Sequence, residues 1–151
     1  MNKTFFKQSV VHMPGKAKVL TQKEISDIFK VLRNSRDQAL FAVGIYTGLR
    51  IAEIIAIRYD QVVTANGGVR NLLKVVRAKK KNTVNSEIPI HPKLRARLQS
   101  YHKEHDKSQW LFPSEVSSTG HLERVRAHYI FPRYQGFSRL CNLRIQVWYH
   151  D

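Results

Sequence analysis

The sequence is poor in cysteine, and Cys141 is the single one among its 151 residues. An internal disulfide is therefore excluded, and a metal site would have to use histidine and carboxylate side chains alone. Long apolar runs are also missing, since none approaches the roughly 20 residues needed to cross a bilayer. Residues 1–20 hold no continuous apolar stretch ahead of a cleavage site. We therefore expect one cytoplasmic domain without a membrane segment.

Acidic residues are scarce as well. The chain has 11 Asp and Glu against 26 Lys and Arg, which gives a formal net charge of +15. Such an excess favours a polyanionic partner, although a basic protein that is merely soluble is the alternative. Clustering favours nucleic acid, because residues 61–107 hold three acidic side chains and eleven basic ones: Arg70, Lys74, Arg77, Lys79, Lys80, Lys81, Lys93, Arg95, Arg97, Lys103 and Lys107.

The first half of the chain shows the periodicity of helices. Residues 1–20 are expected to be an extended lead-in, and the spacing of Thr21 and Glu24 predicts a capping box at the start of an amphipathic helix. A buried second helix is predicted from Ser35 to the turn at Thr47 and Gly48. Residues 49–57 predict a third helix, with Ile51, Ile54, Ile55 and Ile57 on its buried side.

The pattern changes after residue 62. Residues 69–76 and 87–90 are typical of short strands around a basic, turn-prone stretch at 79–86. Pro92 then opens a helix that carries Leu94, Leu98 and Tyr101. Residues 110–113 form an apolar anchor, and a last helix with Leu122, Val125, Tyr129 and Ile130 is stopped by Pro132. The sequence therefore predicts a mainly helical α+β fold with a small antiparallel sheet.

One segment combines a glycine turn, an arginine and a glutamate. Gly48 is predicted to place Arg50 at the start of a helix, with Glu53 three residues further on the same face. Free amides and the helix dipole favour an anion there, and a guanidinium can hold two phosphate oxygens while Glu53 orients it. An exposed ion pair between the two side chains explains the same spacing equally well.

This segment closely resembles the first signature of the tyrosine recombinases, or phage integrases, commonly T-G-[LM]-R-x-x-E-[LI]; it reads Thr47-Gly48-Leu49-Arg50-Ile51-Ala52-Glu53-Ile54. The resemblance continues through residues 88–92, 111–114 and 122–131 and covers about residues 21–138. It implies a mostly helical catalytic fold with a small three-stranded sheet. It also implies an enzyme that breaks and rejoins duplex DNA without metal or nucleotide cofactor, during recombination or integration of mobile elements.

The resemblance assigns roles to particular residues. In this family a tyrosine attacks the scissile phosphate to form a phosphotyrosine link, and cations stabilise the charge that develops. Arg50 matches the first of two family arginines, with Glu53 in support. A lysine on the strand-pair turn protonates the leaving 5′-oxygen. Lys81 fits best, with Lys80 and Lys79 as register alternatives, and Arg77, Lys79 and Lys80 are expected to contact DNA. A solvated charge run is the alternative for these lysines.

The resemblance ends at residues 139–151, a divergent tail. If Arg144 aligns with the second family arginine, Cys141 occupies the place of a histidine. Tyr149 then follows Arg144 by only five residues, too near for the family nucleophile. We therefore expect a catalytic fold that is incomplete at its C-terminus through a frameshift, truncation or misread end. Such a chain would bind double-stranded DNA, and other recombinase protomers, without cleaving.

Two histidine patterns are interpreted as non-functional. His121 and Arg124 have His-x-x-Arg spacing, but they lie too early and inside the preceding helix. His102 and His105 are interpreted as a solvated polar face, because no third ligand has the spacing of a metal site. A non-enzymatic DNA-binding regulator derived from a recombinase is the alternative function, and an RNA-associated protein is a third.

Overall fold

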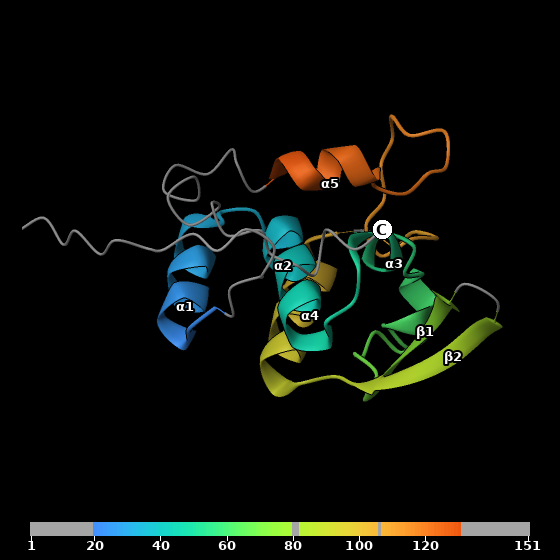
Figure 1. The fold of residues 1–151 in the computed structure, drawn as a ribbon, viewed down its shortest axis with the longest axis horizontal. Coiled ribbons are helices and arrows are strands. Elements are labelled where there is room, and N and C mark those ends of the chain that lie inside the picture. Colours follow the sequence, from blue (N-terminus) through green and yellow to red (C-terminus); the bar gives the residue numbers. More distant parts are fainter. Residues whose placement is uncertain (1–19, 80–81, 106, 131–151) are drawn as a thin grey trace, which may run out of the picture.

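The computed structural model describes residues 20–79, 82–105 and 107–130 (Figure 1). In chain order the elements are helices α1 (Gln22–Val31), α2 (Ser35–Thr47) and α3 (Ile51–Ile55), the 3-10 helix η1 (Tyr59–Gln61), strands β1 (Leu72–Lys79) and β2 (Asn82–Pro89), and helices α4 (Pro92–Glu104) and α5 (Arg124–Ile130). The predicted mainly helical α+β fold with a small antiparallel sheet is confirmed. In the described ranges, no helix is both long and apolar enough to span a membrane.

Local capping fixes the first two helices. The Thr21 amide donates to Glu24 Oε2 at 2.8 Å and the Glu24 amide donates to Thr21 Oγ1 at 3.3 Å, so the predicted capping box is present. The N-cap of α2 is Asn34, whose Oδ1 accepts the Arg36 amide at 2.8 Å. Residues 39–44 of α2 are all buried, α4 packs on this helix, and α1 lies beside both of them (Figure 1).

The hairpin is longer than predicted. β1 and β2 pair antiparallel from Leu72 opposite Pro89 to Lys79 opposite Asn82. Residues 82–86, predicted as part of a turn, belong to β2, because the unpaired backbone of β1 offers them ladder hydrogen bonds that a single-strand pattern cannot reveal. Leu73 and Val75 are buried on one face of β1, whereas Leu72 and Val76 are 41% and 54% exposed on the other.

The third strand that the resemblance implied is reduced to one bridge within the described residues, between Val63 and Val69. A tight turn lies between them. The Thr64 amide donates to Gly68 O at 2.8 Å, and Gly67 adopts a φ of 78°, a left-handed conformation that favours glycine. Because residues 64–68 form this turn, they do not pair as part of a third strand.

Two other helices are shorter than predicted. α3 spans 51–55 rather than 49–57, because Ile57 N bonds Ile54 O in a tightened last turn, although all four predicted isoleucines are buried. α5 begins at Arg124, and Leu122 packs ahead of it with its amide on Phe112 O at 2.8 Å. Of the predicted apolar residues of this helix, Ile130 is buried together with Ala127, whereas Val125 is 63% exposed. α4 begins at Pro92 as predicted, and its three predicted apolar residues are buried.

Candidate functional site

The turn between α2 and α3 is held by its own residues. Thr47 Oγ1 donates to the Val43 carbonyl and accepts the Leu49 amide at 3.3 Å. Gly48 ends α2 with a φ of 65°, and an added Cβ would meet nothing within 4 Å, so backbone conformation alone requires glycine here. Leu49 is fully buried. The backbone that leads into Arg50 is therefore anchored on both sides of the turn.

Glu53 binds the backbone of Arg50 rather than its guanidinium. The Arg50 amide donates to Glu53 Oε2 at 2.8 Å, and the Arg50 carbonyl accepts the first helical bond from Ile54 N at 2.9 Å. The guanidinium has no acceptor with which to cap the helix. No ion pair between the Arg50 and Glu53 side chains occurs in the described part of the chain. The Arg50 side chain is exposed.

The charge available to an anion is that of the guanidinium itself. α3 has five residues, little more than one turn, so its aligned peptide dipoles add little to the field. The helix dipole, which was expected to favour an anion at Arg50, therefore contributes little to anion binding. A guanidinium that stays ionised and presents a planar set of donors remains well suited to two oxygens of a phosphate.

The hairpin that carries the predicted lysines starts beside this site, since β1 packs against α3. The backbones of Arg77 and Lys79 lie in β1. Lys80, Lys81, Arg144 and Tyr149 lie outside the described residues. On the exposed face of the hairpin, Lys74 Nζ lies 3.5 Å from Glu87 Oε1, which offsets part of the local positive charge.

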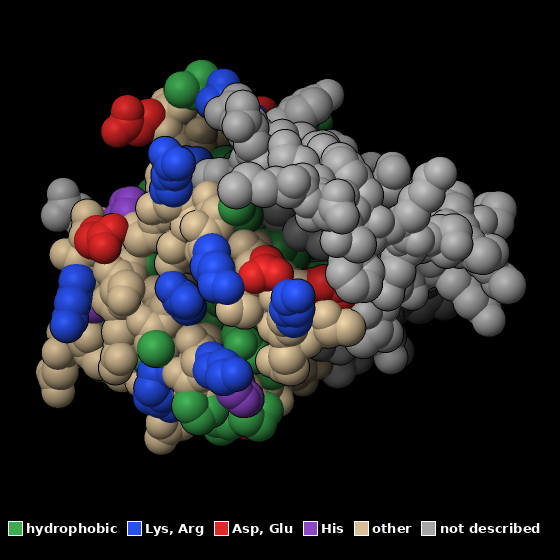
Figure 2. Space-filling model, turned by 90° about the vertical axis from the view of Figure 1, so that its left-hand side faces the viewer, with side chains coloured by type: hydrophobic (Ala, Val, Ile, Leu, Met, Phe, Trp, Pro, Cys, Tyr) green, Lys and Arg blue, Asp and Glu red, His purple; other side chains and the backbone are tan. Residues whose placement is uncertain are grey.

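Several of the basic residues counted in the sequence stabilise the fold. Arg95 donates to Val69 O at 2.8 Å and to Asn71 Oδ1 at 2.7 Å, which ties α4 to the segment before β1. Arg70 Nε donates to Asp60 O at 2.9 Å. These bonds could not be predicted from the sequence, because every residue has a backbone carbonyl and the residue pattern does not show which one accepts. Their acceptors are neutral, so the positive charges persist, and Lys and Arg outnumber acidic side chains on the face shown in Figure 2.

Three tyrosine side chains are described, and each is held by a neighbour. Tyr59 Oη forms a hydrogen bond with His102 Nδ1. Burial raises the pKa of Tyr59. Tyr101 Oη donates to Leu111 O at 2.9 Å, and burial raises its pKa to about 12 even though Arg36 opposes this shift. Tyr46 stacks on His91 with ring centroids 4.8 Å apart. These phenols have structural partners.

His105 and His121 also have partners within the fold. His105 Nδ1 lies 3.0 Å from Tyr101 O, and within the described ranges no three histidine, cysteine or acidic residues gather as metal ligands. His121 was predicted to lie inside the last helix, but it precedes α5, forms a bridge with Pro113 and packs edge-on against Trp110 at 5.0 Å.

The fold has a counterpart among solved structures. The structure is similar to the crystal structure of XerA recombinase, with a TM-score of 0.59 and 16% sequence identity. The match covers 88% of this chain and 46% of that chain, so this chain spans about half the length of that recombinase. None of the curated proteins matches.

The family is set by the sequence. Residues 18–143 match the phage integrase family, and the chain therefore belongs to it.

Proposed function

We propose that this chain binds duplex DNA and that Arg50 binds a phosphate of the DNA backbone. The observation that carries the proposal is the exposed guanidinium of Arg50. Glu53 Oε2 accepts the Arg50 backbone amide at 2.8 Å, and the Arg50 side chain has no partner among the described residues. The net charge of +15 supplies long-range attraction to a polyanion. Family membership supports site-specific recombination as the setting in which this phosphate is bound.

The other predicted residues correspond to positions that take part in strand cleavage in this family. Lys81, with Lys80 or Lys79 as alternatives, would protonate the leaving 5′-oxygen as the phosphate is attacked. Arg77 and Lys79 start from β1 beside α3 and would contact the flanking DNA backbone. Arg144 would be the second arginine of the phosphate site, and Tyr149 is the late tyrosine that would have to attack if a chain of this sequence cleaved DNA. This chemistry calls for no metal or nucleotide cofactor.

We propose further that this chain binds DNA without cleaving it. With Arg144 aligned to the second family arginine, Cys141 stands in place of a histidine, and a thiol is a much weaker hydrogen-bond donor than an imidazole. Tyr149 follows Arg144 by five residues, and in-line attack requires placement to within about an angstrom. A non-cleaving chain with an accessible Arg50 would compete with an intact recombinase protomer for its DNA, which is the alternative, regulatory function.

Salt dependence of DNA binding tests the proposal. Affinity for a fluorescein-labelled duplex, measured by anisotropy, should fall steeply with added salt, because each neutralised phosphate contributes a slope of about −0.9 in log K against log salt. A duplex RNA of the same length is the matched control. A flat salt dependence, or much tighter binding to the RNA, would contradict DNA as the partner.

A further inference from the structure

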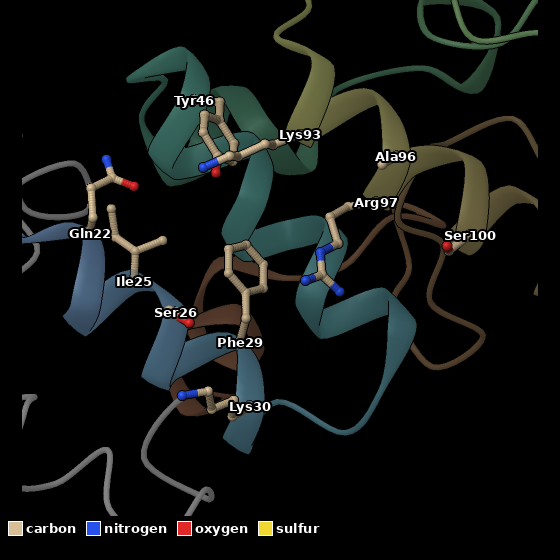
Figure 3. Close-up of a pocket in the computed structure, with 10 residues that line it drawn as sticks. All are labelled: Gln22, Ile25, Ser26, Phe29, Lys30, Tyr46, Lys93, Ala96, Arg97 and Ser100. Carbon is tan, nitrogen blue, oxygen red and sulfur yellow. The ribbon is translucent and has the colours of Figure 1, made fainter.

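A groove of about 480 Å³ runs between α1 and α4 and ends at the last turn of α2 (Figure 3). Its floor is apolar: Ile25 is buried, and the ring of Phe29 packs edge-on against Phe41 with centroids 5.2 Å apart. Its polar wall comes from α4, where Lys93 and Arg97 point toward α1 on either side of Ala96. An apolar floor under a charged wall suits a ligand that has both characters.

The charge of the wall is not offset by the groove's own lining. The described residues that line it include three cations, Lys30, Lys93 and Arg97, and no acidic side chain. Lys30 is already paired with Asp27 at 3.0 Å on the exposed side of α1. Lys93 and Arg97 therefore carry most of the positive charge that a ligand would meet.

Arg97 is held in place by neutral partners. Its Nη1 donates to Gln38 Oε1 at 2.7 Å, and its guanidinium lies 4.4 Å from the centroid of the Phe29 ring. Neither contact cancels the charge, so a cation with little freedom to move faces the groove, and less side-chain entropy is lost when an anion binds.

The spacing of the two cations matches an extended peptide. Lys93 and Arg97 lie one turn apart on α4, an axial separation of about 6 Å. Side chains two apart in an extended strand lie about 6.8 Å apart on one face, and the side chain between them points the other way. Carboxylates at alternate positions can thus reach Lys93 and Arg97 while an aliphatic side chain between them reaches the floor.

Other occupants fit less well. A DNA duplex presents its phosphates on a convex rod and offers nothing apolar to the floor. Bases of a single strand stack on open aromatic faces, but Arg97 covers one face of Phe29 and His91 covers one face of Tyr46. A second copy of this chain would bring another net charge of +15 to a cationic wall.

We propose that the groove between α1 and α4 binds an extended segment of a partner protein in which acidic and aliphatic residues alternate. This interaction is independent of the DNA site at Arg50. The probe is a short fluorescein-labelled peptide of alternating glutamate and leucine, with binding to the full chain measured by anisotropy. A second peptide, with serine in place of leucine, tests the contribution of the floor.

Three variants of the full chain test the site. Lys93→Glu reverses a wall charge, and it should weaken the peptide about fivefold or more, because one attraction is lost and one repulsion is gained. Glutamate in the first turn of α4 is compatible with the helix. Lys103→Glu makes the same charge change on the same helix outside the groove and should have a much smaller effect. Ala96→Trp fills the groove and should abolish binding.

The outcomes separate the alternatives. Saturable binding that Lys93→Glu and Ala96→Trp weaken, and that the serine peptide lacks, supports the proposal. Equal losses in Lys93→Glu and Lys103→Glu, or equal binding of the two peptides, would show a general attraction to positive charge and overturn it. An Ala96→Trp variant that loses duplex DNA and keeps the peptide would assign the groove to DNA. If circular dichroism shows that Ala96→Trp is unfolded, the two lysine variants still decide.

Discussion

Glu53 provides the sharpest test of how the Arg50 site is built. Its carboxylate accepts the Arg50 amide at 2.8 Å, so Glu53→Ala should leave that amide without its partner at the start of α3. Loss of a capping acceptor costs about 1 kcal/mol. For a chain of this size, that corresponds to a fall in Tm of about 3 °C.

Glu53→Gln separates a backbone cap from a side-chain ion pair. The glutamine amide oxygen can still accept from the Arg50 amide, although a neutral acceptor binds about half as strongly as a carboxylate. We therefore expect Glu53→Gln to lose about half as much stability as Glu53→Ala. Urea unfolding monitored by circular dichroism measures both changes through the midpoint at constant m. Glu115→Ala, at an exposed loop glutamate, is the matched control and should change little.

If both Glu53 variants unfold at the same urea concentration as the wild type, the cap contributes nothing to stability and this prediction is wrong. The prediction is also wrong if Glu53→Gln is as unstable as Glu53→Ala. That result would show that the charge of Glu53, acting on the guanidinium, matters more than its acceptor oxygen.

Three further predictions concern the turn, the core and the chemistry. Because Gly48 has a φ of 65°, Gly48→Ala should lower the free energy of unfolding by about 1–2 kcal/mol, and Gly48→Asn should lower it less. Equal stability of the wild type and both variants would contradict this. Burial raises the pKa of Tyr101 to about 12. The stability gained by burying the neutral phenol is therefore fully present below about pH 10 and is lost as the pH rises toward 12. In thermal melts, Tyr101→Phe should lack this loss of stability at alkaline pH. A nicked suicide duplex should give no covalent protein–DNA band on denaturing electrophoresis, and a band that Tyr149→Phe abolishes would show an active enzyme.

The sequence predicts well what short-range interactions determine. The capping box of Thr21 and Glu24 and the proline at the start of α4 are local, and both occur where the pattern places them. The buried isoleucines of α3 follow from helical spacing in the same way. The motif around Arg50 could be found for the same reason, since its turn, arginine and glutamate lie within a few residues of one another.

Long-range pairing explains what the sequence did not predict. The length of β2 depends on the backbone of β1 opposite it, and the contacts of Arg95 with Val69 and of Tyr59 with His102 join residues 26 and 43 positions apart. The capping role of Glu53 left a partial signal, because the glutamate stands three residues after the N-cap as in a capping box. Arginine in place of serine or threonine at that cap concealed it.

Binding of a DNA phosphate by the Arg50 guanidinium is the basis of the proposed function. The most direct measurement is the affinity for a labelled duplex across a salt series, for the wild type and for Arg50→Ala, Arg50→Lys and a control, Arg33→Ala, at another exposed arginine. Arg50→Ala should weaken binding about tenfold at low salt and reduce the magnitude of the salt slope by about one. Arg50→Lys should keep the slope but not the affinity, because lysine has the charge without the planar fork. If Arg50→Ala loses no more than Arg33→Ala in both affinity and slope, Arg50 is an ordinary surface arginine, and the proposal that it binds a DNA phosphate is wrong.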